Sequence, residues 1–370
     1  MSPTPVIWSP SSLAHEPNAE VWIGLRTKGD EVPERVTVIR DALEGAGHEL
    51  QVAAVHPDTV LRAVHSAALV DYLSSVYADW VSAGFPEDPG QDRVVPYFFP
   101  TAAMRGPLPA QPARAVHARA GEFAYDTMTV VGPGTNEAAR GAVDCALTAV
   151  DRVQAGQGSC YALCRPPGHH ATREAFGGSC YLNNAAVAAE AFRRAGHNHV
   201  AVVDIDAHHG NGTEAIFYAR SDVFYGSVHV DPGAGWFPHV VGFAGERGVG
   251  DGYGSTSNFP LAPGSGDGEW LAALGTLITE VEQFAPSALV VSLGVDAARD
   301  DPESPLEVTM AGYERAGELI GSLSRPTVIV QEGGYNLATL GSLVRAFLRG
   351  HDGGDQQVPA TGRGNDAQEL

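Results

Sequence analysis

The sequence predicts an α/β protein with a single large domain, in which helices sandwich a central parallel β-sheet. Short runs rich in β-branched residues alternate with longer, alanine-rich amphipathic stretches, which is the order typical of strands and helices in such a sheet. The length of 370 residues allows two domains, but α/β sheets often use about 250 residues or more as one. With 44% hydrophobic and 18% charged residues, the composition excludes disorder throughout the chain.

Each element follows from these patterns. The β-branched and apolar runs predict strands at Val6–Trp8, Tyr161–Cys164, His199–Asp206, Val223–Val230, Ala288–Asp296 and Thr327–Gln331. The amphipathic stretches predict helices at Glu34–Glu44, Ala67–Ser82, Glu137–Gln154, Asn184–Ala195, Glu269–Gln283, Ala311–Leu323 and Leu337–Leu348.

Two stretches interrupt the alternation of strands and helices. Residues 86–116 hold repeated prolines, and residues 231–268 are rich in Gly, Pro and aromatic residues. Loops this long inside a compact domain are usually functional or disordered. We place the domain at residues 1–350 and expect residues 351–370 to form a polar, flexible tail.

The net charge and the number of cysteines limit which binding partners and which cellular compartment the sequence predicts. The 23 basic and 44 acidic residues give a net charge of −21, which argues against a nucleic-acid partner. The acidic surplus either serves solubility or concentrates cationic substrates. We expect a reducing, cytoplasmic setting for Cys145, Cys160, Cys164 and Cys180, because no secretory leader precedes them, and we expect Cys160 and Cys164 to be core residues rather than zinc ligands. No apolar run reaches the roughly 18 residues that a membrane span needs.

The strongest local signal lies at the end of the predicted strand His199–Asp206. If the extended backbone persists to residue 208, Asp204, Asp206 and His208 project to one side, and Ile205 and Ala207 project to the other. Ligands in open α/β sheets bind at the carboxyl ends of the strands. Two carboxylates placed together repel unless a cation lies between them, so this cluster predicts a metal site.

A third ligand follows another predicted strand. Asp296 comes directly after the run Leu289–Val295 and offers a carboxylate at the same edge of the sheet. Asp206, His208 and Asp296 would give three protein ligands and an open position, the arrangement of a catalytic zinc site. Fe(II) could occupy the same ligands.

Tandem histidines follow a third strand. In Arg165-Pro-Pro-Gly-His169-His170-Ala, the Pro-Pro-Gly turn holds both imidazoles at the strand end. Histidines fixed at this edge are suited to act as acid and base.

The last cluster follows the strand Thr327–Gln331. In Gln331-Glu-Gly-Gly-Tyr335-Asn, the glycines allow a ligand to approach closely, and the Tyr335 hydroxyl would face a developing oxyanion.

Together these motifs resemble the histone deacetylase and acetylpolyamine amidohydrolase branch of the arginase-deacetylase superfamily. RPPGHHA, GGSCYLNNAAVA, DIDAHHGNGT, LGVD and EGGYN occur in the family's order, and the resemblance runs from Val64-His65 to Leu348. The segment SVHVDP, followed by WFPH at 236–239, is most similar to bacterial acetylpolyamine amidohydrolases. The resemblance implies the arginase-deacetylase fold.

The resemblance also implies roles for single residues. Asp206, His208 and Asp296 match the zinc ligands, and Tyr335 matches the tyrosine that polarises the substrate carbonyl. His170 matches the general base, and His169 matches a histidine that stays cationic. Asp204 matches the partner of His169, and Asn211 stands where some members have an Asp as the partner of His170. A structural potassium site is matched by Asp204, Asp206, His208, Ser227 and Val228.

Substrate-binding residues are implied in the same way. Gly178 and Phe237 match residues that line the tunnel for the acyl amine. Ser179 departs from the family, where an aromatic residue is common, so one tunnel wall should be wider and more polar. Glu20 loosely matches an acidic residue that receives a cationic amine, and the proline-bearing loop offers no clear acidic counterpart.

These observations favour a zinc-dependent amidohydrolase that removes an acetyl or other acyl group from a small cationic amine such as an acetylpolyamine. The alternatives are a protein acetyl-lysine deacetylase, a deacylase of secondary metabolites, which Ser179 motivates, and a non-catalytic binder of acetylated ligands. A two-metal ureohydrolase would need more carboxylates than the pattern shows. The amidohydrolase relatives also imply a homodimer in which the long loops narrow the tunnel mouth.

Overall fold

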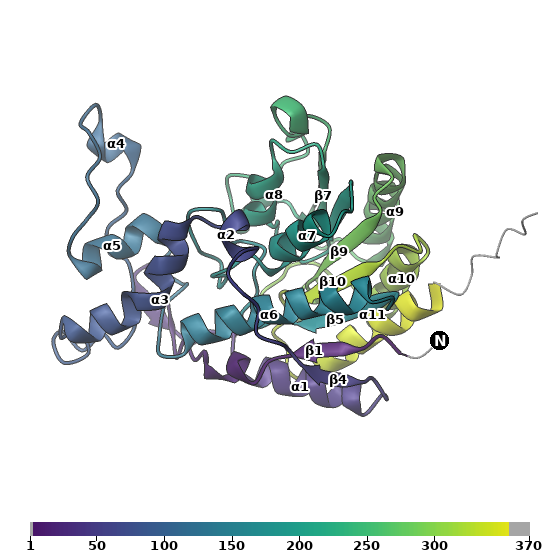
Figure 1. Ribbon diagram of the computed structural model, residues 1–370, viewed down its shortest axis with the longest axis horizontal. Helices are drawn as coiled ribbons and strands as arrows, with labels where there is room; N and C mark the ends of the chain where they lie inside the picture. The colour runs from purple at the N-terminus through teal and green to yellow at the C-terminus, as the bar shows by residue number, and fades with distance from the viewer. Residues whose placement is uncertain (1–2, 355–370) are drawn as a thin grey trace, which may run out of the picture.

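The structure, a computed structural model, describes residues 3–354 of the chain. Within that range, an eight-stranded parallel sheet forms the centre, in the strand order β4-β1-β5-β10-β9-β6-β7-β8 (Figure 1). Its strands are β1 (Val6–Trp8), β4 (Leu50–Val52), β5 (Ser159–Leu163), β6 (Val200–Asp204), β7 (Val223–Val230), β8 (Thr256–Leu261), β9 (Ala288–Leu293) and β10 (Thr327–Gln331). A separate antiparallel hairpin joins β2 (Glu20–Trp22) to β3 (Leu25–Thr27).

Helices occupy the segments between the strands. They are α1 (Glu34–Glu44), α2 (Leu61–Val64), α3 (Ala67–Ser82), α4 (Ala102–Arg105), α5 (Val116–Phe123), α6 (Thr135–Gln154), α7 (Asn184–Arg194), α8 (Asn211–Phe217), α9 (Asp267–Phe284), α10 (Met310–Gly321) and α11 (Leu340–Gly354). Short 3₁₀ helices lie at Pro10–Ala14, Pro232–Ala234 and Gly250–Gly252.

The core consists of two apolar layers, one on each face of the sheet. Along β6, Val200 and Val202 pack in the layer that contains α6 and α7, whereas Ala201 and Val203 pack in the layer that contains α1, α9, α10 and α11. Burial on both faces explains why the sheet strands are nearly continuous apolar runs. The predicted fold, a parallel sheet sandwiched by helices, is confirmed.

Most predicted elements are present with small shifts at their ends. The strands Val6–Trp8, Val223–Val230 and Thr327–Gln331 and the helices Glu34–Glu44 and Ala67–Ser82 have the predicted bounds.

The prediction missed both edge strands of the sheet. β4 has only three residues, and β8 lies inside the segment 231–268 that we predicted to be a loop. β8 contains Pro260, which an edge strand tolerates because one side of its backbone carries no ladder of hydrogen bonds.

The last helix also differs from the prediction. α11 begins three residues later than predicted and continues to Gly354, so residues 351–354 are helical rather than part of the flexible tail. The remainder of that predicted tail, residues 355–370, lies outside the described residues.

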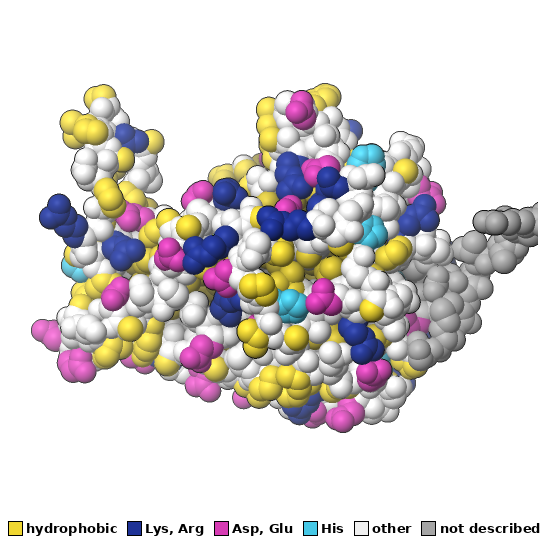
Figure 2. All heavy atoms as spheres, in the orientation of Figure 1, with side chains coloured by type: hydrophobic (Ala, Val, Ile, Leu, Met, Phe, Trp, Pro, Cys, Tyr) yellow, Lys and Arg dark blue, Asp and Glu magenta, His cyan; other side chains and the backbone are white. Residues whose placement is uncertain are grey.

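An arm that carries α4 projects from the lobe formed by α3 and α5 (Figure 1). The arm exposes large apolar side chains, with Tyr97, Met104 and Leu108 respectively 72%, 59% and 65% exposed. The apolar tip of the arm is visible in Figure 2. Within residues 3–354, no helix is long and apolar enough to cross a membrane.

Candidate active site

The sequence-predicted metal ligands meet at the carboxyl ends of β6 and β9. One ligand atom from each of Asp206, His208 and Asp296 lies within 4.8 Å of the other two. The Nδ1 atom of His208 lies 3.2 Å from Oδ2 of Asp296 and 3.4 Å from Oδ1 of Asp206. Both carboxylates are buried, so they converge on one imidazole nitrogen in a place with little solvent to screen them.

The strands end earlier than predicted, at Asp204 and Leu293. The cause is local: Oδ1 of Asp204 accepts the backbone N–H of Asp206, and Oδ1 of Asp206 accepts that of His208 at 2.9 Å. These hydrogen bonds from backbone N–H groups to side chains replace the hydrogen bonds between strands, and the chain bends into a turn. Asp204 therefore ends the strand, and Asp206 and His208 lie in a tight turn beyond it, not on an extended backbone.

Two glycines leave room for an ion at this turn. A Cβ at Gly333 would lie 2.3 Å from Oδ2 of Asp296 and 2.6 Å from Oδ2 of Asp206, and a Cβ at Gly294 would lie 2.1 Å from the latter atom. Only glycine lets both backbones approach the carboxylates this closely. Two carboxylates and one imidazole in a buried cradle are a donor set that suits a divalent transition ion.

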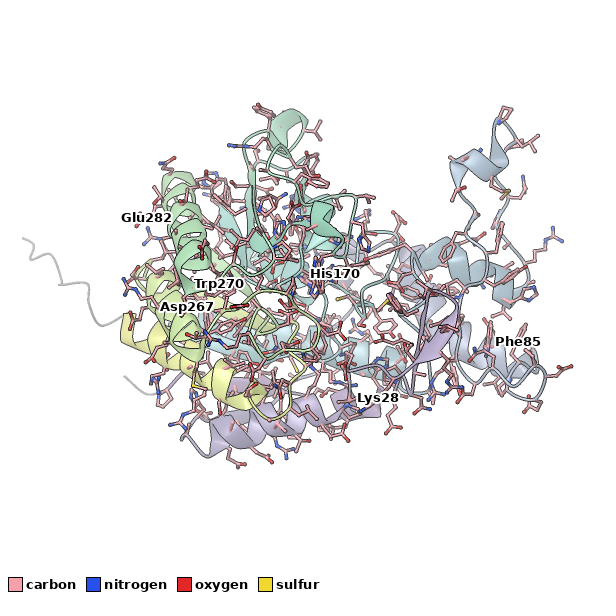
Figure 3. The ribbon with its side chains drawn as sticks, turned by 180° about the vertical axis from the view of Figure 1, so that it is seen from behind. Lys28, Phe85, His170, Asp267, Trp270 and Glu282 are labelled. Atoms are coloured by element: carbon pink, nitrogen blue, oxygen red, sulfur yellow. The ribbon has the colours of Figure 1, made fainter. Side chains whose placement is uncertain are left out.

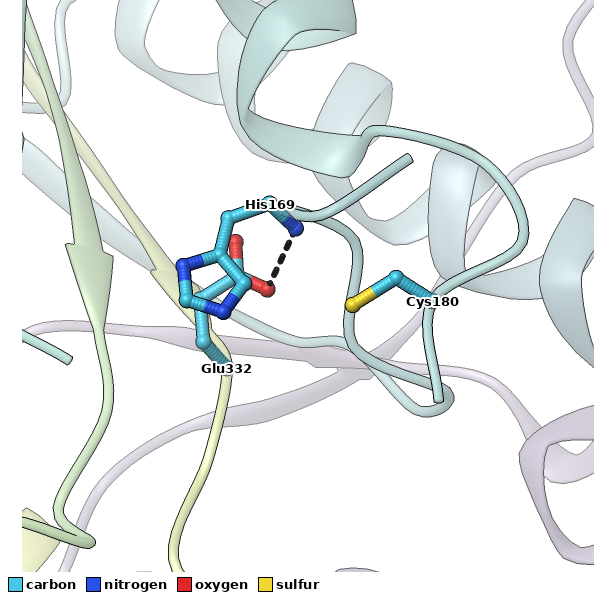
Figure 4. Close-up of side chains that lie close together, drawn as sticks. All are labelled: His169, Cys180 and Glu332. Carbon is cyan, nitrogen blue, oxygen red and sulfur yellow. Dashed lines mark hydrogen bonds between the residues drawn. The ribbon is translucent and has the colours of Figure 1, made fainter. Parts of the chain in front are cut away.

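The turn with the tandem histidines is fixed by Glu332, which follows the neighbouring strand β10 at the same edge of the sheet. Its Oε2 accepts the backbone N–H groups of Gly168 at 2.6 Å and His169 at 3.1 Å, and the latter bond is drawn in Figure 4 beside Cys180. Ser292 donates to the other carboxylate oxygen. Sequence reasoning placed Glu332 in a motif but gave it no role, because the two N–H groups that donate to it lie more than 160 residues away.

The two histidines have different electrostatic environments. Burial lowers the pKa of His169, but Asp206 and Asp204 outweigh it and raise the pKa to about 10, with Nδ1 of His169 lying 3.1 Å from Oδ2 of Asp204. Burial and the positive charge of His169 hold the pKa of His170 well below its usual value. Thus His169 carries the proton and His170 is neutral.

Asn211 selects the tautomer of His170. Its Oδ1 lies 2.7 Å from Nδ1 of His170 and can only accept, so Nδ1 carries the hydrogen and Nε2 keeps its lone pair. His170 lies near the centre of the molecule, between the sheet and the lobe of α3 and α5 (Figure 3).

Tyr335 is held through its backbone and its ring. Oδ2 of Asp301 accepts the N–H groups of Tyr335 at 2.7 Å and Asn336 at 3.2 Å. The Arg35 guanidinium carbon lies 4.7 Å from the centroid of the tyrosine ring. Burial raises the pKa of Tyr335 well above its usual value, so the hydroxyl stays protonated and can donate a hydrogen bond.

One cavity of about 400 Å³ contains the predicted substrate-binding residues. Glu20, Gly178, Ser179 and Phe237 line it together with His170, His208 and Tyr335. A Cβ at Gly178 would lie 2.4 Å from Cδ2 of His170 and 2.9 Å from Cε1 of Phe237, so a side chain there would obstruct the passage. Ser179 has a φ of 60° and donates its N–H to Thr129.

Four carboxyl groups line this cavity, and we call this group the acidic mouth: Glu20, Glu31, Asp126 and Glu303. Burial, followed by the nearby charges of Glu303 and Asp30, raises the pKa of Glu20 to about 8. Sequence reasoning found Glu20 but missed the other three, which lie on separate loops. The segment Asp301-Pro-Glu303 after the LGVD motif was the one local signal for Glu303.

The residues matched to a potassium site lie on adjacent strands. Ser227 on β7 is paired in register with Asp204 on β6. The side chain of Val228 packs in the apolar layer of α9, so its backbone carbonyl is the group available to an ion.

A parallel sheet whose strand ends bring together two carboxylates, an imidazole, a histidine pair and a tyrosine holds the groups that a metal-dependent hydrolase uses. The model of the histone deacetylase domain matches residues 30–351, and the chain belongs to that family. The family resemblance predicted from the motifs is therefore confirmed, and with it the enzyme class, a deacetylase.

Named relatives are similar along nearly the whole chain. The acetylpolyamine amidohydrolase of Burkholderia pseudomallei is 41% identical over 92% of this chain and 96% of its own length. Acetylpolyamine amidohydrolase 1 of Pseudomonas aeruginosa is 37% identical over 94% of this chain and 98% of its own. A crystal structure of the B. pseudomallei acetylpolyamine aminohydrolase superposes with a TM-score of 0.89 at 40% identity and covers 95% of this chain and 99% of the other.

Proposed function

We propose that this chain hydrolyses the N-acetyl amide of an acetylated polyamine or a similar small cationic amine. One observation carries the choice of substrate: a single cavity joins the acidic mouth to His170 and Tyr335. An ammonium group held by Glu20, Asp126 and Glu303 would leave the amide end of a linear substrate pointing toward the histidines. The names of the relatives, acetylpolyamine amidohydrolases, support the same substrate class.

The chemistry would use the groups described above. Zn²⁺ fits the ligand set of Asp206, His208 and Asp296, as does Fe²⁺, and an ion bound there supplies Lewis-acid polarisation of the amide carbonyl and of the attacking water. Nε2 of His170 accepts the proton of that water while Asn211 holds the ring. The Tyr335 hydroxyl donates to the carbonyl oxygen as it becomes negative.

The positive charge of His169 stabilises the same oxyanion. It also keeps His170 neutral before the reaction, so that His170 is free to accept the proton of the water. His170 then returns the proton to the amine nitrogen as the C–N bond breaks. The products are acetate and the free amine.

Three further expectations remain proposals. We infer a structural K⁺ at Asp204, Asp206, His208, Ser227 and Val228, supported by the pairing of Ser227 with Asp204. We infer a homodimer, supported by the exposed apolar side chains of the arm. The four cysteines are buried free thiols, which suits the reducing cytoplasm that we propose as the location.

The experiment that tests the function compares two substrate types on the zinc-loaded enzyme. Acetylputrescine or acetylcadaverine is assayed beside an acetyl-lysine peptide, with Tyr335→Phe as the blank. We expect higher kcat/KM for the free amines, and a loss of about a hundredfold or more in Tyr335→Phe with unchanged zinc content. A preference for the peptide would indicate a protein substrate. Turnover of neither would indicate another N-acyl compound, and binding without turnover would indicate a non-catalytic binder.

A further inference from the structure

A second cluster of metal-binding side chains lies beside the active site but belongs to a different part of the fold. His209, Glu214 and Glu246 each place a ligand atom within 4.8 Å of the other two. His209 follows the metal ligand His208 directly, Glu214 comes from α8, and Glu246 comes from the loop between β7 and β8. The adjacent histidines thus contact different carboxylates: His208 faces Asp296, and His209 faces Glu214.

The imidazole of His209 is buried without a hydrogen bond. Its side chain is fully inaccessible, and within residues 3–354 neither of its ring nitrogens has a hydrogen-bond partner. Yet Nε2 lies 2.5 Å from Oε2 of Glu214. Two buried polar groups this close, with no hydrogen bond joining them, need a cation or a proton between them.

The carboxylates of this cluster are held in place by neutral groups. Nδ2 of Asn258 donates to Oε2 of Glu214 at 3.0 Å and to Oε2 of Glu246 at 3.1 Å. The N–H groups of Gly242 and Phe243 also donate to Oε2 of Glu246. In the described part of the chain, no Lys or Arg forms an ion pair with either glutamate, so the two carboxylates have no protein cation to balance them.

We infer that His209, Glu214 and Glu246 form a second binding site for a divalent transition-metal ion. The donors are one imidazole and two carboxylates, which suits Zn²⁺ or Mn²⁺. The Oδ1 atom of buried Asn258 is also without a hydrogen bond among the described residues, so this amide can supply a fourth oxygen ligand if it turns over.

An ion at this site would tie the β7–β8 loop to the core. Gly242 lies against His209, since a Cβ at this glycine would lie 2.7 Å from Cγ of the His209 ring. The backbone carbonyl of Gly242 also accepts a hydrogen bond from Nε2 of His229. The same loop carries Trp236 and Phe237, which line the substrate cavity. The second ion would therefore stabilise the position of the β7–β8 loop, which forms one wall of the substrate cavity.

The test measures metal stoichiometry. Metal-free protein is titrated with Zn²⁺ alone and, separately, with Mn²⁺ alone, and bound metal is counted after gel filtration. We expect two equivalents in the wild type and one in the double variant Glu214→Gln/Glu246→Gln, whose amides keep the size of the side chains. Asp206→Ala should also bind one, at the second site. Glu282→Gln, which removes an exposed carboxylate on α9 (Figure 3), is the matched control and should bind two.

A second measurement does not depend on the folding of any variant. Wild-type crystals soaked in Mn²⁺ should show an anomalous difference peak between the His209 ring and Glu246. One equivalent in the wild type at saturating metal, or no such peak, would mean that the two glutamates share a proton, and would overturn the inference. Two equivalents in the double variant would overturn it as well.

Discussion

Glu20 offers the sharpest test of how the acidic mouth selects a cation. The change is Glu20→Gln, which keeps the size of the side chain and removes one negative charge from the cavity. Burial and the neighbouring carboxyls raise the pKa of Glu20 to about 8, so about one-tenth of it is ionised at pH 7 and about nine-tenths at pH 9. An ammonium ion binds the ionised form, so its contribution should grow with pH.

The expected magnitude follows from this ionisation. A hydrogen bond between a carboxylate and an ammonium group contributes about 1.5–3 kcal/mol, or roughly 10- to 150-fold in kcat/KM. At pH 9 nearly the whole effect should be present. At pH 7 binding must first remove a proton from Glu20, which costs about one pKa unit and reduces the effect roughly tenfold.

The assay compares acetylputrescine with N-pentylacetamide, a neutral analogue of the same length, at pH 7 and pH 9. The ratio of the two kcat/KM values cancels the pH dependence of the catalytic groups, because both substrates share the same amide. We expect the ratio to rise about tenfold between pH 7 and pH 9 in the wild type and to stay flat in Glu20→Gln. Glu282→Gln, which removes an exposed charge on α9 outside the cavity lining, should behave as the wild type.

The pH dependence of protein stability provides a second test of the raised pKa of Glu20. Because the folded-state pKa of Glu20 lies above the ordinary value of 4.5, its ionisation disfavours the folded protein, and stability falls as pH rises from about 4.5 toward 8. Glu20→Gln should therefore melt at a higher temperature than the wild type at pH 9, and the difference should shrink at pH 5. A substrate ratio that is independent of pH in the wild type, or unchanged by the substitution, would refute the role assigned to Glu20.

Three further changes probe the site and the core. Gly178→Ala places a methyl group against His170 and should lower kcat/KM at least about tenfold with normal metal content; an unchanged rate would mean that the passage is wider than the structure shows. Asp301→Ala leaves the N–H groups of Tyr335 and Asn336 without their acceptor and should lower kcat about tenfold or more, and Asp301→Asn should restore part of it; equal rates in all three proteins would exclude this positioning role. Phe347→Ala removes a fully buried ring and should lower the free energy of unfolding by about 3–5 kcal/mol in urea melts; a loss below 1 kcal/mol would contradict the packing.

The parts of the site that could be predicted from sequence are those whose positions depend on local patterns. Asp206 and His208 follow a buried strand, and His170, Asp296 and Tyr335 follow neighbouring ones, so the topology of a parallel sheet brings them to one edge. That inference needs no knowledge of loop conformation. The predicted gathering of these residues at one edge is present even though the strand ends at Asp204, two residues before Asp206, because the turn keeps Asp206 and His208 at the same edge of the sheet.

The parts that sequence reasoning missed depend on contacts between distant loops. Glu332 holds the turn of the tandem histidines through backbone atoms, and no pattern in the sequence marks a carboxylate that binds N–H groups 163 and 164 residues away. Asp126 and Glu303 reach the acidic mouth from separate loops, and each alone resembles an ordinary surface acid. The edge strand β8 escaped notice because its glycine-rich surroundings and Pro260 are typical of a loop.

A buried ion cluster explains how the acidic mouth and the catalytic residues keep a fixed relation. Glu31 belongs to the mouth, and its Oε1 accepts from Arg35 at 2.9 Å and from Arg165 at 2.7 Å. Arg165 begins the turn that carries the tandem histidines, whereas Arg35 donates to the carbonyl groups of Glu332 and Gly334 and lies over Tyr335.

Burial favours the neutral form of Glu31, but the two arginines outweigh it and lower its pKa, so the carboxylate is charged. All three side chains are no more than 2% exposed, and breaking such a pair by removing one partner costs about 3–5 kcal/mol. The loop that carries Glu31 therefore cannot move independently of the turn of His169 and His170 or of the segment that carries Tyr335. The distance between ammonium and acetyl group in a good substrate is therefore set by a rigid frame, which favours amines of defined length over amines that are merely cationic.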